Sequence, residues 1–163
     1  MIKQPMLTKV FLALRTNFFP EYRDEHVTLA YFYEIRWDAL LDVAEKLDQQ
    51  LPATIHFKRF HEWEAESRTF CGALVTCSDT DILKYVSMPH ITLPQQLVQE
   101  TYAPDVEPVE IVDRLYLGKK VNDQLIWATI KNNQIGPGNA AVNFPRITGN
   151  EQWDKQFYEE PTD

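Results

Sequence analysis

The chain has 163 residues, of which 44% are hydrophobic, and it carries a formal net charge of -8 with an isoelectric point of about 5.0. This length is enough for one domain with a real core and too short for two comfortable domains. The acidic balance excludes a broad basic surface for a long phosphate backbone, although a small anionic ligand can bind in a locally positive pocket.

The first apolar run, 9–14, predicts a buried central strand. Residues 15–24 contain Asn, Pro and several charges, which indicates a loop leading into a second strand at 25–33. A helix follows, with Asp38 as its cap and one apolar face before Pro52. That face consists of Leu40, Val43, Ala44 and Leu47.

The middle of the chain predicts a hairpin of strands 53–61 and 68–77, joined by the charged residues 62–67. A short helix at 79–86 and a strand from Pro89 are expected next. Cys71 and Cys77 are six residues apart on one predicted strand, so about 20 Å separates them and no disulfide can form. We expect free thiols in a reducing compartment.

Residues 109–117 and 124–131 predict a second hairpin, with its turn at 118–123. The segment 136–163 contains Gly-Pro-Gly and no sustained periodicity, so we expect an irregular C-terminal tail that packs on the domain or over its site. The expected organisation is a single α+β domain at 1–135 followed by this tail. No signal peptide or membrane span is predicted, which favours the cytoplasm.

Two short segments repeat a pattern that carries chemistry. They are His26-Val27-Thr28-Leu29 and His90-Ile91-Thr92-Leu93, and each reads as a strand after a loop or helix end. Side chains two apart on a strand point the same way, so each strand offers one imidazole and one hydroxyl on one face. A single His-x-Thr match is common by chance, but two matches that both continue with leucine favour a shared role.

These two motifs, and the order of elements from 9 to 131, resemble the two-histidine phosphoesterase superfamily. That family includes LigT-like RNA ligase and cyclic phosphodiesterase proteins and phage anti-CBASS phosphodiesterases. The resemblance implies a two-lobed β-rich α+β fold, with antiparallel sheets, a few flanking helices and a central cleft. Pro94 stands where many LigT-like members have a basic residue, which argues against the RNA-ligase branch. The compact size and the short spacing of the motifs look more like the phage nucleotide-degrading branch, which would act in the host-cell cytoplasm.

The resemblance implies that His26, Thr28, His90 and Thr92 are catalytic. Two histidines can remove a proton from the attacking oxygen and deliver one to the leaving oxygen, while threonine hydroxyls donate to the nonbridging phosphate oxygens. Sequence alone does not fix which histidine is the base. The scheme requires no metal and no cofactor. The expected activity is cleavage of cyclic oligonucleotides or of 2′,3′-cyclic or 2′,5′-linked ribonucleotides.

Two other functions compete with this hypothesis: RNA 2′,3′-cyclic phosphodiesterase or 2′–5′ ligase processing of RNA ends, and a module that sequesters a nucleotide without cleaving it. In each case the partner is a small nucleotide or an RNA end, with no membrane contact.

Substrate-binding candidates are one cation near the first motif and several aromatic residues, since a nucleobase stacks well on a ring. The cation is Arg15, and the rings are those of Tyr31, Tyr33, Tyr102, Tyr116 and Trp127. Core packing is the alternative for most of the rings. Lys119 and Lys120 are expected in a solvated turn. His56 and His61, five apart on a strand, would face opposite sides and would not share a metal ion without a bulge.

Overall fold

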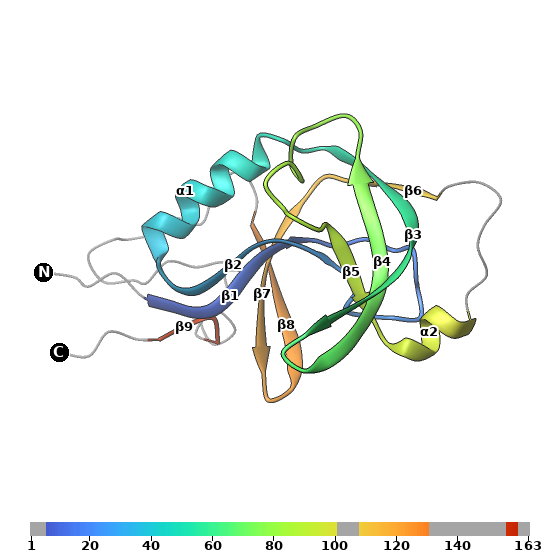
Figure 1. Ribbon diagram of the computed structural model, residues 1–163. Coiled ribbons are helices and arrows are strands. Elements are labelled where there is room, and N and C mark those ends of the chain that lie inside the picture. The colour runs from blue at the N-terminus through green and yellow to red at the C-terminus, as the bar shows by residue number, and fades with distance from the viewer. Residues whose placement is uncertain (1–5, 101–107, 131–155, 160–163) are drawn as a thin grey trace, which may run out of the picture. The chain divides into compact units, whose positions relative to one another are not determined.

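The computed structural model describes residues 6–100, 108–130 and 156–159 (Figure 1). The chain divides into two compact units, which are taken one at a time. The first unit comprises Met1–Ala13, Ala30–Gln49 and Arg114–Asp163, and the second comprises Leu14–Leu29 and Gln50–Asp113.

The first unit is built on a five-stranded sheet. Its strands follow the order β2-β1-β7-β8, and β9 also pairs with β1. Their bounds are β1 Met6–Leu14, β2 Val27–Arg36, β7 Leu115–Val121, β8 Gln124–Ile130 and β9 Tyr158–Glu159. Pairing is antiparallel between β1 and β7, β1 and β9, and β7 and β8. The apolar run that predicted a central strand therefore lies in β1, with β2 and β7 as neighbours.

The helix α1, Trp37–Asp48, contacts β7 in this unit. Leu40 and Ala44 are fully buried, as the apolar face predicted. The predicted cap was wrong: the helix begins at Trp37, which is 2% exposed, and Arg36 is the N-cap without a side-chain bond. Burial of the Trp37 ring favours an earlier start. Asp38 accepts from the neighbouring Ala39 amide at 2.9 Å and pairs with Arg36.

The second unit is built on a four-stranded antiparallel sheet in the order β5-β4-β3-β6. Its strands are β3 Ala53–Ala65, β4 Arg68–Cys77, β5 His90–Leu93 and β6 Val109–Val112. In Figure 1 the long β3–β4 hairpin is the dominant feature of this unit, and β5 runs beside β4. A short helix, α2 Gln95–Glu100, contacts β4.

One face of this sheet is the core of the second unit. Phe57 and Phe60 lie on it because a bulge between Phe57 and Arg59 keeps both rings on one side. Phe18 and Phe19, from the segment before His26, pack against Phe57 with ring centres 6.4 and 6.2 Å apart. Several buried residues complete this face: Ile55, Cys71, Ala73, Val75, Ile91 and Leu93.

Both hairpins have tighter turns than the sequence predicted. Glu66 and Ser67 have φ values of 52° and 62°, and Asn122 and Asp123 have 50° and 63°. Positive φ at both central residues fits the strand twist of a two-residue hairpin. The charged residues 62–65 therefore belong to β3, and Lys119 and Lys120 belong to β7 rather than to a turn.

Four other local features differ from the prediction. Residues 79–86 form turns and no helix. Residues 109–117 are not one strand, because β6 pairs with β3 whereas β7 pairs with β1 and β8. Helix α2 was missed, since six residues after Pro94 are too few to show a helical period. No regular structure was expected after 136, yet Tyr158–Glu159 form β9 and Phe157 is buried; most of that segment lies outside the described residues.

The α+β class, with two sheets and few helices, is confirmed. Cys71 and Cys77 are both free thiols. Within the ranges that the structure describes, no helix is long and apolar enough to cross a membrane.

Candidate active site

The first histidine of the repeated motif stands one residue before a strand. The segment was predicted to be extended from Glu25, but β2 begins at Val27. His26 Nδ1 donates to the Asp24 carbonyl oxygen at 2.7 Å. Residues 15–25 form a loop before the strand. The Glu25 side chain bonds to residues within this loop.

Glu25 is a buried carboxylate, 2% exposed, that fastens this loop. It accepts hydrogen bonds from the Phe18 amide at 2.8 Å, the Phe19 amide at 2.6 Å and the Thr16 hydroxyl. Burial raises the pKa of Glu25, and these three hydrogen bonds partly oppose the rise. Since Glu25 immediately precedes His26, the three bonds fix the position from which the imidazole projects.

The second histidine is the first residue of β5, and it makes the same bond. His90 Nδ1 donates to the Met88 carbonyl oxygen at 2.6 Å. A carbonyl oxygen can only accept, so Nδ1 carries the proton in both histidines. Nε2 is then the ring nitrogen of His26 and of His90 that can accept a proton. The two motifs thus share a backbone contact, from the imidazole to the residue two positions earlier.

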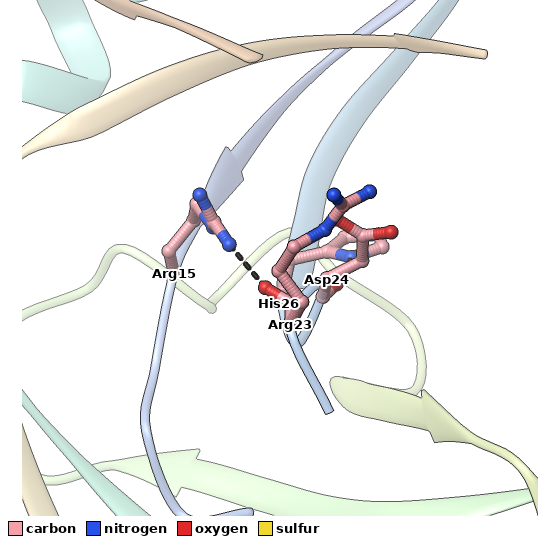
Figure 2. Close-up of polar contacts among 4 residues, drawn as sticks. All are labelled: Arg15, Arg23, Asp24 and His26. Atoms are coloured by element: carbon pink, nitrogen blue, oxygen red, sulfur yellow. Dashed lines mark hydrogen bonds and ion pairs between the residues drawn. The ribbon is translucent and has the colours of Figure 1, made fainter. Parts of the chain in front are cut away.

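The two histidines belong to the same unit, and the charges around His26 act on it. Burial lowers the pKa of His26, and the positive charges of Arg15 and His90 lower it further. The Asp24 carbonyl and carboxylate partly oppose this. Figure 2 shows the Arg15 guanidinium, which donates to the Arg23 carbonyl, close to His26. Neutral His26, which can accept a proton, is therefore favoured more than in an ordinary histidine.

The threonines alternate with core residues as the strand pattern predicts. Val27 and Ile91, the middle residues of the two motifs, are fully buried. Thr28 is half-buried and Thr92 is exposed. Thr92 therefore lies on the side of β5 away from the core, together with His90, whereas Thr28 alternates with the buried Val27 on β2 and His26 precedes that strand.

Aromatic residues beside His90 were missed in the sequence. The Trp63 ring meets the His90 ring edge to face, with centres 4.6 Å apart. Phe70, opposite Trp63 across the hairpin, stacks against it at 5.9 Å. A two-residue turn at 66–67 pairs 65 with 68, 64 with 69, and therefore Trp63 with Phe70. The sequence would have predicted this aromatic pair if the turn had been placed correctly.

The predicted binding residues divide between the units. Arg15 lies in the second unit near His26. The four rings lie in the first unit, mostly around Phe11: its ring centre is 6.4 Å from that of Tyr31 and 5.5 Å from that of Trp127. Tyr116 meets Trp127 at 6.3 Å, and Tyr33 is 68% exposed beneath the Lys9 ammonium. Tyr102 lies outside the described residues.

His56 and His61 do share a sheet face, because the bulge in β3 supplies the register change that the prediction lacked. Their partners Thr76 and Gly72 are four residues apart on β4, about 13 Å along the strand, so the two imidazoles are far from a common ion. His56 Nε2 lies 2.8 Å from the Ser78 hydroxyl. Among the residues the structure describes, no three metal-ligating side chains gather.

Comparisons with known proteins give few relatives. No protein-family model matches the sequence, and no curated protein matches it. Two crystal structures of E. coli LigT are similar in fold. The complex with NADP+ has a TM-score of 0.46 and 16% identity, covering 79% of this chain and 96% of that one. The complex with ATP has a TM-score of 0.42 and 17% identity, covering 78% and 96%.

Proposed function

We propose that this protein is a metal-independent phosphodiesterase that cleaves small nucleotides by acid–base catalysis with His26 and His90. One observation carries the proposal. The two His-x-Thr motifs place their histidines in one unit, both with Nδ1 bonded to the carbonyl two residues earlier. Both imidazoles are thereby oriented to exchange protons at Nε2, which is the requirement for a pair of acid–base groups.

His26 serves as the base and His90 as the acid in the cleavage direction. His26 Nε2 takes the proton from the attacking oxygen, a ribose 2′-hydroxyl or water, as that oxygen bonds to phosphorus. The bond to the leaving oxygen breaks, and His90 Nε2 gives its proton to that oxygen. The lowered pKa of His26 supports this assignment, because a base must begin the reaction neutral.

Thr28 and Thr92 hold the phosphate. Thr92 lies on the same side of β5 as His90, and Thr28 follows His26 by two residues, so both hydroxyls can donate to the nonbridging oxygens. Negative charge concentrates on these oxygens in the transition state. Arg15, whose positive charge already acts on His26, adds to the attraction for an anionic group.

The test is a substrate panel followed by phosphorus NMR and mass spectrometry of the products. The panel contains 2′,3′-cyclic nucleotides, 2′,5′-linked dinucleotides and cyclic oligonucleotides, each assayed with and without excess chelator. We expect at least one to be cleaved at a rate that chelator does not change. Both His26→Ala and His90→Ala should lower the rate by about 10²–10⁴-fold, with unchanged melting temperatures.

His56→Ala is the matched control, because His56 lies on the same sheet but bonds Ser78. Its rate should equal that of the wild type. Cleavage that survives replacement of both His26 and His90 would overturn the proposal. Tight nucleotide binding with no product over hours would replace it with the sequestering module.

A further inference from the structure

The sheet face that carries His90 and Thr92 also carries a row of flat side chains. In register, Thr92 pairs with Gly72, which pairs with His61, and Phe70 pairs with Trp63. Residues two apart on a strand share a face, so these side chains all project on the side opposite the core. The row begins at the second catalytic motif and extends toward the β3–β4 turn.

Three rings of this row, those of His61, Trp63 and Phe70, are nearly parallel, whereas the His90 ring meets Trp63 edge to face. Trp63 is inclined by 14° to His61 and by 17° to Phe70, with ring centres 6.3 and 5.9 Å apart. The Arg68 guanidinium lies over the Phe70 ring at 5.1 Å. The row starts at His90, whose ring centre is 4.6 Å from that of Trp63. Gly72 stands between the β4 partners of Trp63 and His90 and has no side chain to separate them.

Core packing does not explain this row. Phe57, on the other face of β3, is 7% exposed, and Cys71 and Ala73 on the other face of β4 are also buried. Trp63 and Phe70, in contrast, are only half-buried, and Arg68 is exposed. Aromatic rings held partly open on a sheet, with a cation beside them, are suited to stacking with the bases of a single strand.

We propose that Trp63 and Phe70 form a stacking platform for two nucleobases next to the scissile phosphate. The inference rests on the proposed function for the position of that phosphate at His90 and Thr92. One base stacks on Trp63 and the next on Phe70, while Arg68 receives the phosphate that follows. The substrate is then an oligonucleotide of at least two nucleotides on this side, and a mononucleotide leaves the platform unused.

Binding measured by calorimetry tests whether an oligonucleotide uses the platform and a mononucleotide does not. The probes are AMP, a 2′-deoxy adenosine dinucleotide and the matching trinucleotide. AMP has no phosphodiester bond to cleave, and the two longer probes lack the 2′-hydroxyl that could act as a nucleophile. We expect affinity to rise by about 5- to 150-fold for each added base that the platform accepts, which corresponds to ordinary base–aromatic stacking. A linear and a cyclic dinucleotide, compared at equal concentration, distinguish an RNA end from a cyclic messenger as the source of the bases.

Phe70→Leu and Trp63→Leu keep apolar volume on their strands but remove the ring faces. Phe70→Leu should abolish the gain from the last base, and Trp63→Leu the gain from the first. Tyr85→Leu is the control, since Tyr85 is 90% exposed in the segment before β5 and should leave all affinities unchanged. Circular dichroism checks that each variant is folded.

The inference is wrong if the dinucleotide binds no better than AMP, or if Phe70→Leu retains the full trinucleotide affinity. These outcomes are independent of turnover. If affinity rises with each added base but no substrate is cleaved, the platform is supported and the proposed function is wrong. If a substrate is cleaved but affinity does not rise with each added base, the proposed function is supported and the platform is wrong.

Discussion

His26 and His90 have the same nearest contact and different supports. Both donate from Nδ1 to a carbonyl two residues earlier. His26 ends a loop that Glu25 fastens from within, among the charges of Arg15 and Asp24. His90 begins an edge strand of four residues and lies against the Trp63 ring. The same motif thus occurs in two settings, and the orientation of the imidazole is a local property of the motif, because both histidines make the same backbone contact.

After the histidine variants, the largest expected effect concerns the two threonines. If the two motifs act alike, replacing either threonine should have the same effect. Thr28→Val and Thr92→Val keep shape and remove one donor each, so each should lower kcat by about 10²–10³-fold, the usual cost of losing one donor to a developing charge. Steady-state kinetics on a substrate from the panel measures this. Thr76→Val, on the same face of β4 as Gly72, is the control. If the two variants lose different amounts of kcat, the two threonines do not have the same role.

Removing Glu25 tests the support of His26. Glu25→Ala leaves the Phe18 and Phe19 amides without their acceptor in a buried site, and we expect a loss of about 3 kcal/mol in the free energy of unfolding. Urea denaturation measures this loss. Unchanged stability would mean that the loop is held by its phenylalanines alone.

The pH dependence of this support has a definite sign. Because burial raises the pKa of Glu25, the folded state favours the protonated form. Its contribution to stability is therefore full below the ordinary pKa and declines as the pH rises through the raised value. Glu25→Gln, which does not titrate, should remove that slope from a series of urea denaturation curves.

Gly72 tests the support of His90. A Cβ at Gly72 would lie 2.0 Å from the Ile91 carbonyl oxygen, so β5 must shift away from β4. Gly72→Ala should cost about 1–3 kcal/mol and, by displacing His90, lower kcat by up to about 10²-fold. Gly118→Ala is the control, since its Cβ would meet the Phe11 ring in the first unit. A wild-type kcat in Gly72→Ala would contradict the role given to this strand pairing.

The smallest effect concerns charge. Arg15→Gln removes a positive charge that lowers the pKa of His26, so that pKa should rise toward its ordinary value. A base works only when deprotonated, so the acid limb of the profile of kcat/KM against pH should move to higher pH. Arg36→Gln, which breaks only a surface pair with Asp38, should leave the limb in place. If the acid limb stays in place and the alkaline limb moves to higher pH instead, the roles of His26 and His90 are reversed.

Much of the local structure could be predicted from the sequence. The apolar spacing of Leu40 and Ala44 predicted α1, and the alternation around Val27 and Ile91 predicted which way each threonine faces. These features depend on neighbours in the chain. The assignment of β6 and β7 to different sheets could not be predicted, because it depends on pairing with strands that are distant in the sequence.

The candidate site was predictable only in part, for the same reason. The four motif residues repeat a visible pattern, but the role of Glu25 depends on amides six and seven residues away. The contact of Trp63 with His90 crosses three strands. The aromatic residues selected near the motifs in sequence instead belong, apart from Tyr102, to the first unit.

The carbonyl contacts of the two histidines also explain why the repeat is so short. Every residue type has a backbone carbonyl, so Asp24 and Met88 perform the same task although their side chains have nothing in common. A backbone carbonyl acceptor requires a certain backbone conformation at that residue but does not require a particular side chain. Two sites of this kind can therefore diverge in every position around the histidine and threonine and still present the same imidazole nitrogen.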